Sequence, residues 1–148
     1  MIPQNNEKLT DALIGEDIEI SVEPSLTYAM QPKKSRIEGF RDELDAMRQA
    51  VYKIVHTERY KYPIYDWNYG IELNDLFGMP IPFVYSMIKV RIQEALEVDE
   101  RIIEVIDFKF SNPRKHSVHV EFTVRTIFGD IDFDELLNLR RWIYVLQR

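Results

Sequence analysis

The 148-residue sequence predicts an α+β fold, with a small antiparallel sheet packed against two main helices and an extended N-terminal arm. Two segments, 37–54 and 84–95, carry apolar residues at spacings of three and four, which indicates helices with one buried face. A third segment, 102–128, holds two strand-like runs separated by a turn. We expect the arm, with an extended strand, at 1–34, the folded domain at 35–133 and a C-terminal extension at 134–148.

The arm is expected to contain extended structure. Apolar residues alternate with polar or small ones at 18–22, and again at Leu26, Tyr28 and Met30, on either side of Pro24. Proline in such a pattern is typical of an edge strand. Because a small sheet has two exposed edges, this segment is a candidate to cover or donate to an edge.

The first helix is expected to begin at a capping box, in which Ser35 and Glu38 accept from each other's backbone N–H groups. It should end near His56 or Thr57. Its apolar stripe would be formed by Ile37, Phe40, Leu44, Met47, Val51 and Ile54.

A long connection without a regular period follows at 58–81, with one turn of helix expected at 72–77. It contains a cluster of aromatic residues, namely Tyr60, Tyr62, Tyr65, Trp67 and Tyr69. Tyrosine and tryptophan suit an interface as well as a core. The cluster therefore predicts either a contact surface or a plug that closes the core.

The second half of the chain is expected to contain a helix and a hairpin. Pro82 suits the first turn of the helix, and the strands at 102–110 and 118–128 should pair across a turn at 111–115. A short strand is expected at Ile131 and Phe133. The tail is predicted to be a helix capped by Asp134, with the face Leu136, Leu139, Ile143 and Leu146, although Trp142, Tyr144 and Leu146 also alternate as in a strand.

Composition argues against several classes of partner. The net charge of -6 disfavours nucleic acid and anionic membrane surfaces, because both bind basic proteins. The absence of cysteine excludes disulfides and thiolate metal sites and suits a reducing cytoplasm. No apolar run approaches ~18 residues, and residues 1–10 lack the apolar core of a signal peptide.

The sequence holds no catalytic or cofactor motif, so we expect no catalysis, no cofactor and no metal. It contains neither a G-x-S-x-G motif nor a glycine-rich phosphate loop. His116 and His119 do not share a strand face, and the acidic run 130–135 lacks the spacing of a calcium loop. The one catalytic alternative is a cell-wall glycosidase that uses Glu58 and Asp66 as paired carboxylates beside the aromatic residues.

Several stretches of the chain resemble a known family. They are TERYKYPIYDWNYGIEL at 57–73, RIQEAL at 91–96, DERI at 99–102 and FTVRTIFG at 122–129. Over about residues 24–131 the chain resembles phage-tail proteins of PBSX-like defective prophages and tailocins. That family is similar to the baseplate wedge or sheath-initiator proteins of contractile tails, a group that once carried a lysozyme-like label.

The resemblance implies a structural subunit, in six copies, that links the baseplate and tail tube to the first sheath ring. The implied partners are the sheath protein, tail tube or hub proteins and other baseplate wedge proteins. The implied fold resembles the handshake domain of the sheath, which accepts strands from neighbouring subunits. We expect the chain in the bacterial cytoplasm during assembly and then in the phage tail or tailocin particle.

The resemblance also marks candidate interface residues near the second helix. The family's Glu-Pro-Arg triplet corresponds to Asp99, Glu100 and Arg101, so the acid and the arginine are kept while glutamate replaces the rigid proline. Asp99 and Arg101 either anchor a neighbouring subunit or form a salt bridge within the domain.

Further candidates lie in and before the long loop. Glu58 and Arg59 are expected at the end of the first helix, either in the interface or as solvated terminal residues. Tyr65, Trp67 and Tyr69 are candidate interface anchors, because tyrosine and tryptophan are enriched in binding hot spots.

Overall fold

The computed structural model describes residues 25–112 and 116–139. Its strands and helices, in chain order, are β1 (Thr27–Gln31), β2 (Arg36–Arg41), α2 (Glu43–Val55), α3 (Ile81–Leu96), β3 (Ile102–Ser111), β4 (Ser117–Thr126) and β5 (Gly129–Asn138). Short 3₁₀ turns lie at Pro32–Lys34 and at Asn74–Leu76. The α+β class is confirmed, as are the second helix, the hairpin of β3 and β4, and the turn of helix expected near 72–77.

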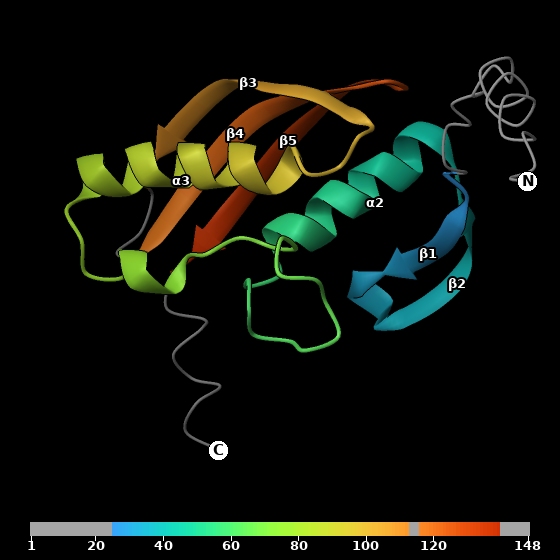
Figure 1. Cartoon of the computed structure of the whole chain (residues 1–148), viewed down its shortest axis with the longest axis horizontal. Helices are drawn as coiled ribbons and strands as arrows, with labels where there is room; N and C mark the ends of the chain where they lie inside the picture. Colours follow the sequence, from blue (N-terminus) through green and yellow to red (C-terminus); the bar gives the residue numbers. More distant parts are fainter. Residues whose placement is uncertain (1–24, 113–115, 140–148) are drawn as a thin grey trace, which may run out of the picture.

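The larger sheet is antiparallel and has the order β3-β4-β5. Along β4 the buried side chains alternate with partly exposed ones, so one face of the strand is apolar and the other is polar. The apolar face joins the core with the buried sides of α2 and α3. Figure 1 shows α3 lying along this sheet, with α2 beside its β5 side.

The two edges of this sheet differ. β5 pairs with β4 in unbroken register, from Ser117↔Asn138 to Thr126↔Gly129. β3 pairs with β4 with two register shifts, one of them between Ile106 and Lys109. Asp107 lies in that shift and has a positive φ of 57°, so β3 bulges where β5 is regular.

A second, two-stranded sheet is formed by β1 and β2. It is fixed to α2 by Gln49, which accepts a hydrogen bond from the backbone N–H of Met30 (2.8 Å) and donates one to the carbonyl of Tyr28 (2.8 Å). The strand expected around Leu26–Met30 is confirmed. It pairs with β2 and not with the larger sheet, and the alternating stretch at 18–22 lies outside the described residues.

The predicted start of the first helix is wrong. Residues 36–41 form β2, and the helix begins at Glu43, with the Asp42 side chain accepting from the Glu43 N–H (2.8 Å). The backbone of Ser35 adopts the left-handed conformation, with a φ of 49°. Ile37 and Phe40 matched the helical spacing, but both are exposed in β2, so they were never part of a buried stripe.

The helix predicted from Asp134 is also wrong over the described residues. β5 continues to Asn138, because ten residues of β4 offer it a paired edge. Its buried residues Ile131, Phe133 and Leu137 follow the period of two. β5 thus crosses the boundary predicted between 133 and 134, and the remainder of the tail lies beyond the described part. Within that part, no helix is long and apolar enough to span a membrane.

Candidate functional site: the aromatic loop and the free sheet edge

The segment from Tyr60 to Tyr69, called here the aromatic loop, is closed by a short neck. The backbone N–H of Arg59 donates to Ile71 (3.1 Å), and the N–H of Ile71 donates to Thr57 (2.9 Å). These bonds make a parallel bridge between Glu58 and Ile71. The ends of the loop are therefore held together although the loop itself has no regular structure.

Gly70 lies in this neck for a steric reason. Its φ is +95°, and a Cβ atom built on it would lie 2.5 Å from the backbone oxygen of Thr57. Any side chain would therefore both strain the backbone and collide with the opposite strand of the neck.

Glu58 is buried beneath the loop, with 5% of its surface exposed. Its carboxylate accepts hydrogen bonds from the backbone N–H groups of Leu73 (3.1 Å) and Asn74 (3.3 Å), at the start of the 3₁₀ turn. Burial raises the pKa of the Glu58 carboxyl above its ordinary value, against the lowering effect of these bonds. The alternative of a solvated helix terminus is wrong for Glu58.

Two arginines tie the loop region to its surroundings. The Nε of Arg59 donates to the carbonyl of Gly70 (3.1 Å), and its guanidinium lies 3.7 Å from the Glu72 carboxylate. Arg91 of α3 donates to the carbonyl of Glu72 (2.5 Å) and pairs with both carboxylate oxygens of Asp75. The hydrogen bonds from Arg91 hold the pKa of Asp75 below its usual value. The loop is thus anchored at its base by charge-assisted bonds.

The aromatic loop presents its side chains to solvent. Ile64 is 87% exposed, Trp67 78% and Tyr60 65%, while Tyr65 stays 45% exposed although it stacks on Tyr69 at 4.5 Å between ring centroids. Tyr69 alone in the cluster packs against the core. The alternative that the cluster plugs the core is therefore wrong except at Tyr69. The exposure of Ile64 was missed because an isolated isoleucine gave no periodic signal.

The turn at Asp99–Arg101 lies close to the loop. Arg101 donates to the Asp99 carboxylate through Nε (2.9 Å) and Nη2 (2.7 Å), which is the geometry of a two-point ion pair. Burial raises the pKa of Asp99, but the bonds from Arg101 outweigh it and the pKa is lowered. Burial also raises the pKa of Tyr69, and the charge of Asp99 adds to that effect. The predicted salt bridge within the domain is present, and Glu100 beside it is exposed.

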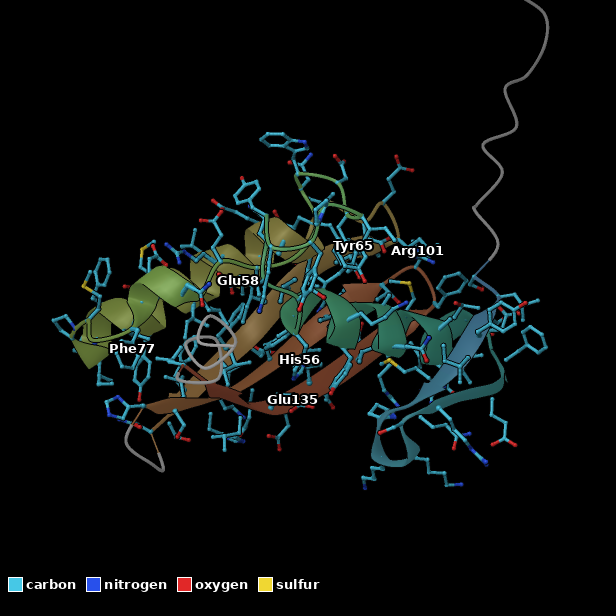
Figure 2. All side chains as sticks on the ribbon, turned by 90° about the horizontal axis from the view of Figure 1, so that it is seen from below. His56, Glu58, Tyr65, Phe77, Arg101 and Glu135 are labelled. Carbon is cyan, nitrogen blue, oxygen red and sulfur yellow. The ribbon has the colours of Figure 1, made fainter. Side chains whose placement is uncertain are left out.

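Figure 2 shows Tyr65 and Arg101 next to each other, with Glu58 further from Arg101. The charge of Asp99 also acts on Tyr69, on which Tyr65 stacks, so the turn and the base of the loop are neighbours.

The paired carboxylates of the glycosidase alternative are not arranged for catalysis. Glu58 is buried, and its oxygens are engaged by backbone N–H groups. Asp66 is exposed in the loop and accepts from the N–H of Trp67 (2.7 Å). A general acid has to reach the substrate oxygen, and Glu58 is closed off from it.

The second candidate surface is the outer edge of β5, which pairs with no other strand among the described residues. A groove of about 280 Å³ lies beside it, with Asp132–Glu135 on one wall and Arg41, Arg48 and Tyr52 on the other. His56 at the end of α2 lies 3.9 Å from Glu135, and Figure 2 shows these two side chains facing each other. The sequence predicted a short strand at Ile131 and Phe133, but it missed the continuation of that strand to Asn138 because it predicted a helix from Asp134.

A three-residue group on the outer face of the sheet was also missed. Potential ligand atoms of His119, Glu121 and Asp134 lie within 4.8 Å of one another. His119 is already bonded to Asp134 and lies 3.7 Å from Glu121. These three residues lie together because β5 pairs with β4, which places Asp134 opposite Glu121 and close to His119.

Comparison with known proteins identifies the family. The family model for the contractile injection system sheath initiator matches residues 26–129. The chain is 36% identical over 137 residues to the phage-like element PBSX protein XkdS of Bacillus subtilis (strain 168), which covers 88% of this chain and 96% of that protein. Both findings agree with the resemblance in the sequence: this chain belongs to the contractile injection system sheath initiator family, a family of structural phage-tail components.

Proposed function

We propose that this chain joins the baseplate and tail tube of a contractile particle to the first sheath ring by accepting an extended strand of the sheath protein on the free edge of β5. The observation that carries the proposal is the contrast between the two sheet edges. β5 keeps its register over all ten residues, whereas β3 is bulged at Asp107. A regular edge offers evenly spaced N–H and C=O groups to an incoming strand.

The surroundings of β5 support the same use. The groove beside it has an acidic wall, Asp132–Glu135, and a basic wall that includes Arg41 and Arg48. An extended segment entering this groove would gain main-chain hydrogen bonds along β5 and side-chain contacts on both walls. Affinity would come from the backbone, and selectivity from the charged and apolar side chains of the groove.

The remaining partners belong to the same proposal. The tube or hub proteins and other wedge proteins would lie on the opposite side from the sheath, with six copies of this chain around the tail. Assembly would take place in the bacterial cytoplasm. The burial of Glu58 supports a structural subunit over a glycosidase, since no described carboxylate pair in the loop faces a substrate.

Hydrogen exchange on the purified chain, with and without the purified sheath subunit of its particle, tests the strand addition. We expect the amides of β5 to gain protection and those of β3 to stay unchanged, because only β5 offers a regular edge. Protection of β3 alone, or of neither edge, would overturn the proposal.

Two neighbouring proline substitutions sharpen this test. Along an antiparallel strand, successive N–H groups point to opposite sides, so Asp134→Pro and Glu135→Pro differ in which ladder they break. One of them removes a bond to β4 and destabilises the chain. The other leaves the fold intact and should abolish sheath binding. A folded variant that still binds sheath as tightly as the wild type would contradict strand addition.

A further inference from the structure

We infer that the strand accepted by β5 is two-sided in charge: it carries basic side chains at alternate positions on its outer face and an acidic side chain on the face toward α2. The inference rests on the proposed function, because it specifies the chemistry of the strand that the β5 edge would bind. Its own support is the distribution of charge on the two faces of β5.

The outer face of β5 carries a line of carboxylates, called here the acidic row. Asp130, Asp132 and Asp134 occupy alternate positions of the strand, and all three are exposed. Ile131 and Phe133, which lie between them, belong to the buried core. Because side chains alternate along a strand, the acidic row lines the outer face of the edge at which a new strand would pair.

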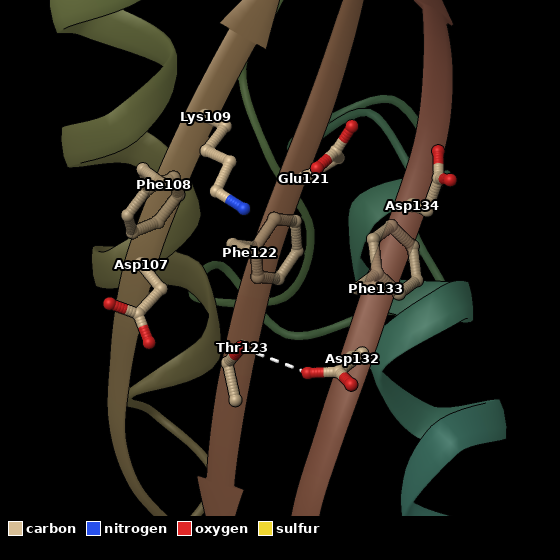
Figure 3. Close-up of a pocket in the computed structure, with 9 residues that line it drawn as sticks. All are labelled: Asp107, Phe108, Lys109, Glu121, Phe122, Thr123, Asp132, Phe133 and Asp134. Atoms are coloured by element: carbon tan, nitrogen blue, oxygen red, sulfur yellow. Dashed lines mark hydrogen bonds between the residues drawn. The ribbon is translucent and has the colours of Figure 1, made fainter.

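β4 neutralises the first part of the acidic row incompletely. Asp130 lies opposite Arg125 at 3.7 Å, but the same arginine also pairs with Glu104 of β3. Asp132 lies opposite Thr123, whose neutral hydroxyl donates to it (3.0 Å), as Figure 3 shows. One cation is therefore shared between two acids, and the charge of Asp132 has no cation directly opposite it on β4.

The far end of the acidic row is crowded with negative charge. Asp134 lies directly opposite Glu121, and like charges in cross-strand positions repel each other. His119 is bonded to Asp134 and lies 3.7 Å from Glu121, so one histidine serves both carboxylates. Lys109 lies opposite Glu121 on the β3 side, away from the β5 edge. A basic side chain on an added strand would pair with Asp134 from the open side.

The face of β5 toward α2 has the opposite requirement. Arg41 and Arg48 line the far wall of the groove beside β5. Arg48 is only loosely paired, with Asp45 at 3.8 Å, and more than half of its side chain is exposed. Glu135 on the β5 wall already has His56 at 3.9 Å. An acidic side chain on the inner face of the added strand would therefore meet the two arginines, whereas a basic one would be repelled by them.

The same pattern disfavours this chain as its own partner. Two β5 edges paired by twofold symmetry would bring the acidic row at 130–134 of one copy against the same row of the other. The chain's own residues 140–148 do not match either. Arg140 and Arg141 are adjacent, and neighbouring side chains of a strand point to opposite faces, so only one of them could face the acidic row.

A charge reversal in the acidic row tests the inference. The double variant Asp132→Lys, Asp134→Lys should bind the purified sheath subunit about 30-fold more weakly than the wild type, because two attractions become repulsions. The control, Glu94→Lys with Glu97→Lys, makes the same change of net charge at exposed sites at the end of α3. It should lose less than about threefold, since salt screens distant charges. Equal losses in the two double variants, or no loss in either, would overturn the inference.

Photo-crosslinking identifies the bound strand and leaves the acidic row unchanged. The substitution Leu136→p-benzoylphenylalanine places a probe on the outer face of β5, where Leu136 is 43% exposed. We expect one adduct in the sheath protein, mapped by mass spectrometry to a segment with lysine or arginine at alternate positions and an acidic residue between them. Glutamate at those basic positions should restore binding to the Asp132→Lys, Asp134→Lys variant. An adduct within this chain, or with a segment that lacks the alternation, would overturn the inference.

Hydrogen exchange separates this inference from the proposed function. If the sheath subunit gives no protection of β5 in the wild type, the strand addition is wrong and the charge pattern falls with it. If β5 is protected but the Asp132→Lys, Asp134→Lys variant binds as tightly as the wild type, only the charge pattern is wrong.

Discussion

The aromatic loop and the β1–β2 hairpin both expose apolar side chains, but they are held in different ways. The loop has no secondary structure and is closed by a backbone bridge, two arginines and the buried carboxylate of Glu58. The hairpin is a two-stranded sheet whose register shifts between Tyr28 and Met30, and it exposes Tyr28, Ile37 and Phe40. Gln49 supplies its hydrogen bonds to α2. Both regions are therefore held by hydrogen bonds to the rest of the domain, whether or not they have regular secondary structure.

The difference predicts two kinds of response to substitution. A loop anchored to buried groups should open when those groups are removed. A two-stranded sheet is marginal on its own, so the hairpin should depend on its hydrogen bonds to α2. A substitution that disrupts one of these regions should therefore leave the other intact.

The largest effect is expected from Gly70→Ala. The new Cβ would meet the Thr57 backbone oxygen at 2.5 Å in a positive-φ conformation, so the free energy of unfolding should fall by about 3 kcal/mol. Urea denaturation measures this. The matched control is Gly39→Ala in the hairpin, where φ is +79° and no atom lies within 4 Å. That change should cost only about 1 kcal/mol, and equal losses would contradict the steric account of the neck.

A smaller effect is expected from Glu58→Ala. Removing the carboxylate leaves the N–H groups of Leu73 and Asn74 without their partner, which should cost about 2 kcal/mol. Hydrogen exchange should show faster opening of the loop neck and no change in β1. Glu94→Ala, at an exposed site on α3, is the control. An unchanged stability would mean that the loop does not depend on this carboxylate.

Gln49→Ala tests the hairpin in the same way. The change removes both hydrogen bonds to β1 and should cost about 1–2 kcal/mol. We expect faster exchange at the Met30 amide with no change at Ile71 in the loop neck. Lys53→Ala, on an exposed site of the same helix, controls for the loss of side-chain atoms. Coupled loosening of both regions would show that they are not independent.

The smallest effect is a dependence of stability on pH. Burial raises the pKa of Glu58 in the folded state above its ordinary value of 4.5. In the window from 4.5 up to the folded pKa, the unfolded chain holds fewer protons at this site, so the free energy of unfolding falls as pH rises. Glu58→Gln lacks this titration. The wild type should therefore lose stability relative to Glu58→Gln across that window, and a constant difference would contradict a raised pKa.

The sequence predicted those parts of the fold in which one local pattern had a single interpretation. The stripe from Val84 to Ala95 became α3, and the alternation in 118–126 became β4. It failed where two patterns overlapped. Ile37 and Phe40 fit a helical stripe, but pairing with β1 placed them in a strand. Leu136 and Leu139 suggested a helix, but the edge of β4 drew residues 129–138 into β5.

The candidate site was predicted in part for the same reason. The aromatic composition of 60–69 was plain in the sequence. The resemblance marked Asp99 and Arg101 but left open whether they pair within the domain or with a neighbouring subunit. The role of Glu58 depends on backbone N–H groups fifteen and sixteen residues further along the chain. No local pattern reports such a bond. The groove beside β5, with its acidic and basic walls, likewise exists only because distant segments fold against each other.

The bulge at Asp107 makes the larger sheet directional. β5 ends in a regular ladder, but β3 is distorted at its middle, and bulged edges resist pairing with another strand. Under the proposed strand addition, such a sheet would be extended once, on the β5 side only. Pairing of the β5 edge of one copy with the bulged β3 edge of another is disfavoured, so the same feature would oppose edge-to-edge growth of copies into a fibre.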